Sequence, residues 1–581
     1  MRSFLLALTA ATALATAAQS ATVYPLDRAT ILVGSPFDFK VEFNAKLKPE
    51  DVRISVNGAD YKTAFGTDAG FIEMEKGKDD KELGSAVLLR GVKITKAGAY
   101  KIEVAAGAET KTVTWDVYAT PAMPKAKNVI FLLGDGLSVA HRTAARLMSK
   151  GMTEGKANGR LAMDDLDHMA FIGTSSTGAI ATDSANTMSA YMTGHKSAIN
   201  ALGVYADRTP ASLDDPKVEN IAEALRRTTK KSLGIVALSE LEDATPAAVV
   251  SHTRRRADKA EIVGMMFAQK PEVVLGGGSA YFLAKEVPGS KRKDDKDYVK
   301  LFQDAGYQLA TDKDELQKVA GADHILGLFH TGNMDYALDR MQLKKGTVEQ
   351  FPKQPGLVEM TKVALDNLSR NPEGFFLMVE GSDIDKASHP LDWDRAVFDT
   401  IEFDHAVAVA RAFQQAHPDT LVVVTGDHTH GVSLIGTIDD TKPFKEGRDK
   451  VGTYDEARFP NYEDKDGDGY PDTVAVTRHL AMFANNGPDH YETFEPKLDG
   501  PFEPAVKAQD GTYVANEKYK DVPGAVFVEG NIPRDQDTGV HAVDDVVLQA
   551  AGPGAEEFKG YMEESDVYKV LADTLALGSK P

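Results

Sequence analysis

The chain contains no cysteine, so it has neither disulfide bonds nor thiolate ligands for a metal. Any zinc that it binds must be held by histidine and carboxylate groups. A protein without disulfides that works outside the cytoplasm must be stabilised by core packing or by bound metals. The absence of cysteine therefore limits both the sources of stability and the kinds of metal site.

Positive charge is also in short supply, since 66 lysines and arginines face 87 aspartates and glutamates. The formal net charge of −21 argues against nucleic acid or an anionic membrane as a partner. The 42% of hydrophobic residues is ordinary for a globular protein. A chain of 581 residues exceeds one ordinary core, so we expect at least two domains.

Long apolar runs are scarce, and the clearest one lies at the N-terminus. Arg2 is followed by the alanine-rich stretch from Phe4 to Ala18, which is typical of a signal peptide with a cut near residues 17–21. We assign residues 1–21 to this signal, because the run is too short for a membrane span. No later run of about 18 apolar residues follows, so we expect an exported, soluble protein that is periplasmic or secreted.

Residues 22–118 differ in pattern from the rest of the chain. Short alternating segments recur there, for example Phe37–Phe43, Val52–Val56 and Tyr100–Ala105, and turn residues separate them. This spacing predicts a small β-sandwich that is immunoglobulin-like in outline. It carries no catalytic constellation, so we interpret it as an accessory or packing domain.

From Asn128 onward, after a proline-containing linker, apolar strands alternate with helical stretches. A helix over Val218–Arg227 precedes a strand over Ser232–Leu238, and a helix over Ala396–Gln415 precedes a strand over Leu421–Thr425. Such alternation predicts an α/β domain over 126–581, with a mostly parallel central sheet between helices.

One long segment interrupts this alternation. Residues 437–535 are polar and rich in glycine, proline, aspartate and tyrosine, so we expect a surface insertion. The last strand is expected after it, over Val546–Ala550.

Three apolar runs in the predicted sheet end in a carboxylate: Asp135, Glu380, and Asp427, which is followed by His428. Such continuous runs are typical of buried parallel strands, whose carboxyl ends gather ligands at one edge. Three acids brought together there repel one another unless cations lie between them. The strand ends therefore predict a polynuclear metal site, and with it an enzyme.

Two further segments carry chemistry. Ser184 falls near a predicted helix N-terminus, where it is either a simple cap or a nucleophile facing an anion. Asp385 and His389 lie four residues apart, so on a helix they share one face and form either a surface pair or part of a metal site.

These residues belong to an ordered series that closely resembles the alkaline phosphatases, over roughly residues 126–575. Each motif is weak alone, but the order and separations are jointly specific. The series is Gly134-Asp135-Gly136, Thr182-Asp183-Ser184-Ala185, Asp243-Ala244-Thr245-Pro246-Ala247, Val379-Glu380-Gly381 with Asp385-Lys386 and His389, Gly426-Asp427-His428, and Thr538-Gly539-Val540-His541. The resemblance implies a three-layer, alkaline-phosphatase-like α/β domain behind the small sandwich.

The resemblance also implies two zinc ions and one magnesium ion, held by residues that match the family's motifs. One zinc would take Asp385, His389 and His541. The second would take Asp135, Asp427 and His428. Magnesium would take Asp135, Thr245 and Glu380, an all-oxygen set that suits it.

Ser184 would be the nucleophile that becomes phosphorylated, and Arg256 would bind the phosphate. Two more arginines lie beside Arg256 in His252-Thr253-Arg254-Arg255-Arg256, so that assignment could shift by one or two positions. Three further residues would support the metal ligands without binding metal themselves. Asp243 and Lys386 would tune magnesium and phosphate binding, and His430 would orient a zinc ligand.

The activity that the resemblance implies is hydrolysis of small phosphate monoesters through a phosphoserine, and the family's habit implies a homodimer. A phosphodiesterase of the same superfamily is the alternative, since such relatives share the dizinc site. A sulfatase is disfavoured because Ser184-Ala-Asn-Thr-Met lacks the Ser-x-Pro-x-Arg sequence. A calcium-dependent adhesion protein is the non-catalytic alternative.

A separate acidic loop lies within the insertion. Asp464, Asp466, Asp468 and Asp472 occupy positions 1, 3, 5 and 9 of an EF-hand-like loop, with the Tyr470 carbonyl at position 7. Ala475 stands where the twelfth-position glutamate would be, so a complete EF-hand geometry is in doubt. The loop is interpreted as a structural Ca²⁺ site or as a solvated acidic turn.

Overall fold

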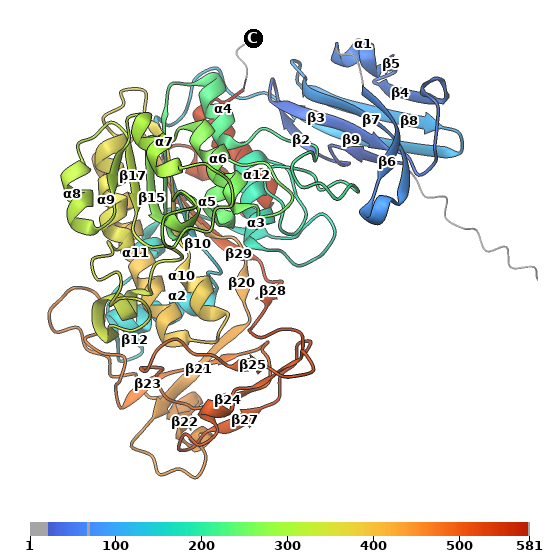
Figure 1. Cartoon of the computed structure of the whole chain (residues 1–581). Coiled ribbons are helices and arrows are strands. Elements are labelled where there is room, and N and C mark those ends of the chain that lie inside the picture. Colours follow the sequence, from blue (N-terminus) through green and yellow to red (C-terminus); the bar gives the residue numbers. More distant parts are fainter. Residues whose placement is uncertain (1–20, 67–69, 579–581) are drawn as a thin grey trace, which may run out of the picture.

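The computed structural model describes residues 21–66 and 70–578. The predicted signal peptide lies outside the described residues except for its last position. The described chain forms a pair of N-terminal sheets and a larger α/β part that carries an extended insertion (Figure 1). Within the described ranges, no helix combines the length and apolarity that crossing a bilayer requires.

The N-terminal part consists of two sheets that share one hydrophobic core. Alternate residues of β8 (Gly98–Ala106) and β9 (Glu109–Tyr118) point inward, so that Val104, Val113 and Trp115 are buried between the sheets. The predicted strands match observed ones, except that the segment Phe37–Phe43 runs one residue past the end of its strand. The immunoglobulin-like outline stays a prediction. One sheet contains β1 (Thr22–Tyr24), β3 (Pro36–Glu42), β7 (Glu82–Lys93) and β6 (Gly70–Lys76), and the other contains β2 (Thr30–Leu32), β9 (Glu109–Tyr118), β8 (Gly98–Ala106), β4 (Val52–Val56) and β5 (Ala59–Asp60).

A ten-stranded sheet forms the centre of the α/β part. Neighbouring strands run parallel except β29, which is antiparallel to both of its neighbours, so the prediction of a mostly parallel sheet is confirmed. The prediction that this strand is the last one is wrong, because β30 follows it and pairs with β13. The order is β16 (Gln308–Ala310), β17 (Ile325–Leu328), β15 (Val273–Gly277), β14 (Ser232–Glu240), β18 (Phe375–Gly381), β10 (Asn128–Gly134), β19 (Thr420–Gly426), β29 (Val546–Ala551), β13 (His168–Gly173) and β30 (Gly560–Glu563).

Helices cover both faces of this sheet and make three layers. Along β10, Val129 and Phe131 join one core, while Ile130 and Leu132 join the core of the opposite face. Both faces of the central strands are therefore apolar, which explains their continuous apolar runs. One face packs against α3 (Ser184–Thr193), α4 (Ile221–Thr228), α5 (Ala244–Ala248), α6 (Lys259–Gln269) and α12 (Glu564–Leu575), and the other against α2 (Val139–Lys150), α9 (Leu357–Leu368), α10 (Asp383–Ser388) and α11 (Trp393–Ala416).

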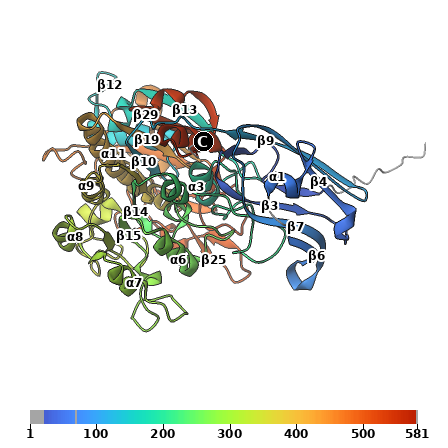
Figure 2. The same cartoon turned by 90° about the horizontal axis from the view of Figure 1, so that it is seen from above.

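The predicted insertion is more ordered than its sequence indicates. It begins with β21 (Val432–Asp439), earlier than predicted, and this strand pairs with β22 (Val451–Gly452) and β23 (Arg478–Ala484). Two short antiparallel pairs follow, β24 (His490–Glu492) with β27 (Val526–Val528), and β25 (Ala505–Lys507) with β26 (Tyr513–Ala515). In Figure 1 the insertion lies below the main sheet, and in Figure 2 the N-terminal sheets lie to the opposite side of the α/β part from α8 (Lys313–Val319) and α9.

Candidate active site

Three neighbouring strands bring the predicted carboxylates to one edge of the sheet. Gly134 of β10 pairs in register with Gly381 of β18 and with Gly426 of β19. Asp135 and Asp427 follow two of these glycines, so the three strand ends converge as the pattern requires. The edge carries no apolar side chain at these positions to separate the charges.

Ser184 is the first residue of α3 and lies against this edge. Asp183 is the N-cap, and its carboxylate accepts a hydrogen bond of 3.0 Å from the Asn186 N–H. The Ser184 Oγ lies 3.3 Å from Asp135 Oδ1 and 3.3 Å from His428 Nε2. The hydroxyl is therefore aimed at the strand-end groups, and Asp183, not Ser184, caps the helix.

A cluster of imidazoles surrounds Asp385. Its Oδ1 lies 3.2 Å from His389 Nε2, 2.7 Å from His430 Nε2 and 3.7 Å from His541 Nε2. His541 arrives from far along the chain because β20 (Thr429–His430) pairs with β28 (His541–Ala542), which aligns His430 with His541. One carboxylate and several ring nitrogens thus converge on a small volume. His430 was predicted to orient a zinc ligand without that ligand being named, and it is hydrogen-bonded to Asp385, one of the predicted zinc ligands.

A second group contains Asp135, Asp427 and His428, whose candidate ligand atoms lie within 4.8 Å of one another. One oxygen of Asp427 accepts hydrogen bonds of 3.0 Å from the Gly136 and His428 N–H groups. Its other oxygen is buried and has no hydrogen-bond partner among the described residues. A buried anionic oxygen without a partner is costly, and a cation would satisfy it.

The predicted magnesium ligands occupy the neighbouring position. Glu380, at the end of β18, accepts a hydrogen bond of 2.7 Å from the Ser239 hydroxyl. Thr245 lies on the short helix α5, and its buried hydroxyl has no hydrogen-bond partner among the described residues. Both groups offer oxygen, and neither meets a cationic side chain within hydrogen-bonding distance.

Cationic side chains lie on the side of the site nearest α5. The Arg256 guanidinium contacts Asp243 Oδ1 at 2.8 Å and Asp183 Oδ2 at 3.5 Å. Lys386 Nζ lies 3.3 Å from Asp243 Oδ2 and 3.4 Å from Asp385 Oδ2. Arg256 is therefore held beside Asp183, the N-cap of the Ser184 helix, and Lys386 beside Asp385, and both are side chains of the kind that bind phosphate.

The two arginines beside Arg256 are directed elsewhere. Arg254 donates to the backbone carbonyls of Asp207 and Thr209, and Arg255 is largely exposed next to Asp258. Among the three neighbours, Arg256 is thus the one that contacts residues of the site.

The carboxylates at the strand ends resist ionisation together. Burial, and then the charge of Asp135, raises the pKa of Glu380 well above its usual value. The same two causes raise the pKa of Asp427 to about 7. Without an added cation the strand ends therefore hold protons that acids in water would release.

Two other groups of the site, His428 and Asp385, are instead held in their charged forms. Burial alone would lower the pKa of His428, but the charge of Asp427 and the hydrogen bond to Asp135 outweigh it and raise the pKa to about 9. Burial would likewise raise the pKa of Asp385, yet the charges of His389 and Lys386 hold it well below the usual value.

The residues present fit the metals that the resemblance implies. The mixed nitrogen and oxygen donors around Asp385 and around Asp427 suit zinc, and the oxygen donors of Glu380 and Thr245 suit magnesium. The oxygens of Asp427 and Thr245 that have no hydrogen-bond partner support this fit independently of the resemblance, because a bound cation would satisfy them.

Two residues of the site were missed from sequence. Asp183 both caps α3 and contacts Arg256, and its position directly before Ser184, with Asn186 three residues later, is a capping signal that could have found it. Ser239 donates to Glu380 from the end of β14, and nothing in its sequence surroundings distinguishes it.

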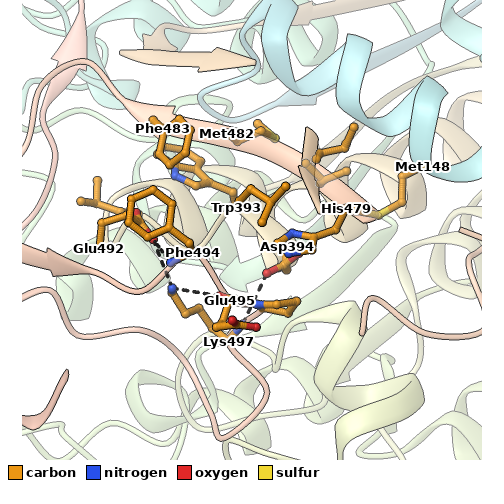
Figure 3. Close-up of a pocket in the computed structure, with 15 residues that line it drawn as sticks. Met148, Trp393, Asp394, His479, Met482, Phe483, Glu492, Phe494, Glu495 and Lys497 are labelled. Carbon is orange, nitrogen blue, oxygen red and sulfur yellow. Dashed lines mark hydrogen bonds and ion pairs between the residues drawn. The ribbon is translucent and has the colours of Figure 1, made fainter. Parts of the chain in front are cut away.

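The pocket in Figure 3 lies away from these groups. It has a volume of about 40 Å³ and is lined by side chains including Trp393, His479 and Lys497, where the start of α11 meets the insertion. Lys497 donates its backbone N–H to Asp394 at 3.4 Å. The cavity admits only a few waters, so it is a packing gap between α11 and the insertion.

The fold and the ligand set define a metal-dependent enzyme of the α/β class. A family model described as alkaline phosphatase matches residues 126–577, and the chain belongs to this family. It is an enzyme of the phosphomonoesterase class. The N-terminal sheets lie outside the matched residues.

The chain is 30% identical over 492 residues to the alkaline phosphatase of Gadus morhua, with 78% of this chain and 92% of that protein covered. It is also 30% identical over 463 residues to alkaline phosphatase 4 of Bacillus subtilis, with 78% and 89% covered. The solved alkaline phosphatase of Thermus thermophilus superposes with a TM-score of 0.56 at 22% identity, covering 80% of this chain and 93% of that one, and supports the fold.

Proposed function

We propose that this alkaline phosphatase family member hydrolyses phosphate monoesters through a phosphoserine at Ser184. The observation that carries the proposal is the position of the Ser184 hydroxyl, at a helix N-terminus and 3.3 Å from both Asp135 and His428. A serine in that position has donors for an anion on one side and metal ligands on the other.

The site would take two zinc ions and one magnesium ion. The first zinc would be held by Asp385, His389 and His541, the second by Asp135, Asp427 and His428, and magnesium by Asp135, Thr245 and Glu380. When bound, these cations would supply Lewis-acid chemistry that activates the attacking oxygen and stabilises the leaving oxygen.

The chain's own groups account for the rest of the reaction. The N–H groups at the start of α3 and the Arg256 guanidinium bind the phosphoryl oxygens, and Asp183 and Asp243 hold that guanidinium in place. The Ser184 Oγ loses its proton and attacks phosphorus, and the P–O bond to the substrate alcohol breaks. The leaving alkoxide takes up one proton, which balances the one that Ser184 lost. Water then breaks the phosphoserine bond, which releases inorganic phosphate and restores the Ser184 hydroxyl.

Replacing Ser184 with alanine tests the proposal. We expect Ser184→Ala to lower the rate on nitrophenyl phosphate by at least about 10³-fold and to abolish acid-stable labelling by radioactive phosphate. Ser149→Ala is the control, because that hydroxyl bonds only the Ala145 carbonyl of its own helix. A Ser184→Ala protein that keeps its metals and a tenth of the activity would contradict the phosphoserine mechanism.

Rates on mono- and diesters of nitrophenol separate the proposal from the phosphodiesterase alternative. We expect the monoester to be the better substrate, because Arg256, Lys386 and the α3 N-terminus offer donors and positive charge for the third free oxygen and second charge that a diester lacks. A faster diester would favour the alternative.

The acidic loop stays a predicted Ca²⁺ site. The carboxylates of Asp464, Asp466 and Asp468 lie within 4.8 Å of one another and are exposed. Tyr470 stacks on Phe398 of α11 with ring centroids 4.9 Å apart, so the loop is fixed to the α/β part at that point. A cation there would hold the insertion against α11.

Export and dimerisation also stay predictions. N-terminal sequencing should show that the mature protein begins near residues 17–21, that is, within or directly after the predicted signal peptide. Sedimentation should give twice the mass of one chain.

A further inference from the structure

The N-terminal sheets and the α/β part share a hydrophobic core. Tyr205 and Val218, which follow α3 in sequence, are buried in the N-terminal core together with Phe37 and Trp115. Tyr205 also packs on Tyr24 with ring centroids 5.7 Å apart. The two parts are therefore joined by more than their linker.

The segment that enters this shared core is a hairpin, residues 203–218, which we call the docking hairpin. Its ends are joined by hydrogen bonds from Tyr205 N–H to the Pro216 carbonyl at 2.9 Å and from Val218 N–H to the Gly203 carbonyl at 3.1 Å. Val218 is held in this pairing and α4 begins only at Ile221, so the predicted helix start at Val218 is three residues early.

A buried ion-pair network fixes the docking hairpin to the N-terminal sheets. Lys40 Nζ of β3 lies 2.5 Å from Asp207 Oδ2, 2.7 Å from Glu75 Oε1 and 3.1 Å from Glu42 Oε1. Arg208 of the hairpin donates to Glu75 at 2.7 Å and to the backbone carbonyl of Phe43 at 2.8 Å. The three acids form a group that could hold a metal by spacing, but the Lys40 ammonium already takes the cation's place.

Backbone hydrogen bonds continue the same attachment. Asp38 N–H donates to the Lys217 carbonyl at 2.8 Å, and Lys217 N–H donates to the Asp38 carboxylate at 2.9 Å. Arg90 of β7 pairs with that carboxylate at 2.5 Å and also donates to the Asp214 and Asp215 carbonyls. Both strands of the docking hairpin are thus held from the N-terminal side.

The docking hairpin in turn holds the segment that leads to Arg256. Arg254 donates to the carbonyls of Asp207 and Thr209, and its N–H donates to the Ser212 carbonyl at 3.0 Å. Thr253 pairs with Leu202 at the base of the hairpin through hydrogen bonds of 2.7 and 2.9 Å.

The last contacts reach the site itself. Arg256 N–H donates to the Asn200 carbonyl at 2.8 Å, and Asn200 N–H donates to the Asp183 carboxylate at 3.0 Å. Asp183 is the cap of the Ser184 helix and a contact of the Arg256 guanidinium. An unbroken series of direct contacts therefore connects Lys40 to both groups that bind phosphate.

We propose that the N-terminal sheets position Arg256 for phosphate through the docking hairpin, and that Lys40 and Arg208 are positioning residues for the reaction. The inference rests on the proposed role of Arg256. A domain that only packs against the enzyme would stabilise it without changing its affinity for phosphate, whereas a domain that positions Arg256 sets that affinity.

Inhibition by inorganic phosphate tests this inference. We expect Lys40→Met and Arg208→Ala to raise the inhibition constant for phosphate and the KM for nitrophenyl phosphate by about 3- to 10-fold in the full chain, with metal content unchanged. Lys46→Met is the matched control, because Lys46 forms an exposed pair with Glu73 at 2.7 Å in the same sheets. It should leave both constants unchanged.

Arg256→Ala separates failure of the inference from failure of the proposed function. If Arg256→Ala weakens phosphate binding but Lys40→Met and Arg208→Ala do not, the positioning inference is overturned and the proposed function stands. If Arg256→Ala itself leaves phosphate binding unchanged, the proposed role of Arg256 fails. Should Lys40→Met not fold, Arg208→Ala decides alone, because Arg208 is partly exposed and Lys40 would keep its three acidic partners.

Discussion

Two buried groups, each of three candidate metal ligands, are stabilised in different ways. Glu42, Glu75 and Asp207 surround the Lys40 ammonium at the junction with the N-terminal sheets. The strand-end group around Asp427 contains His428 but no lysine or arginine, and one Asp427 oxygen has no hydrogen-bond partner among the described residues. Spacing alone would make both groups candidate metal sites, so what distinguishes them is whether a lysine of the chain occupies the place between the acids.

The direction of the pKa shifts expresses the same difference. Burial would raise the pKa of Asp207, but the hydrogen bond and charge of Lys40 outweigh it and lower the pKa. Burial and the charge of Asp135 raise the pKa of Asp427 to about 7. Asp207 is stabilised in its charged form by Lys40, whereas Asp427 would need a cation from solution for the same stabilisation.

Metal removal should have the largest effect and should act on one group only. We expect exhaustive chelation to lower the phosphatase rate by at least about 10³-fold and zinc with magnesium to restore it. Amide exchange in β3 and β7, beside Lys40, should be unchanged by chelation, because the cation there belongs to the chain. If calcium restored activity faster than zinc with magnesium, the proposed difference between the two groups would be contradicted.

Neutralising one acid of each group should change stability with opposite signs. In the metal-free protein at pH 8, Asp207→Asn should lower the free energy of unfolding by about 2 kcal/mol, because Lys40 loses a charged partner. Asp427→Asn should raise it by about 1 kcal/mol, because a buried charge that is repelled by Asp135 is removed. Denaturant titration measures both, and two changes of the same sign would contradict the distinction.

Asp215 of the docking hairpin provides a smaller test through pH. It is fully buried, and burial raises its pKa from 3.8 to about 7, although Arg254 opposes this. Its contribution to folding is complete below about pH 4 and is lost as the pH rises through about 7, at a cost on the order of 1–3 kcal/mol. We expect Asp215→Asn to remove this loss, so that the variant unfolds at higher denaturant than the parent at pH 8 and not at pH 4. Equal shifts at both pH values would assign the effect to packing.

Much of the candidate metal site could be predicted from sequence, because its carboxylates stand at strand ends. Asp135, Glu380 and Asp427 each follow an apolar run, and parallel register then brings them together. His541 was found by the family's motif alone, since its placement depends on the pairing of β20 with β28.

The contacts between the N-terminal sheets and the docking hairpin could not be predicted in the same way. Lys40 and Asp207 are 167 residues apart, and each looks like an ordinary surface charge in its local sequence. The alternating pattern of β8 and β9 predicts that they are strands of a sheet. It does not predict which loop of the rest of the chain packs against that sheet. Pairing between distant residues of this kind is decided by packing and charge in the folded chain.

The acidic loop of the insertion is a third group of acids, and it sharpens the comparison because its carboxylates are exposed. Asp464, Asp466 and Asp468 are solvated, so the free energy that a Ca²⁺ ion adds is local. We expect calcium to slow proteolytic cleavage within 463–473 by a few-fold without changing the phosphatase rate, and Asp468→Asn to remove the protection. Asp510→Asn, at another exposed turn of the insertion, is the control. If calcium does not change the cleavage rate, the loop is a solvated turn. In that case three clustered acids require a metal only when they are buried and also lack a cationic side chain.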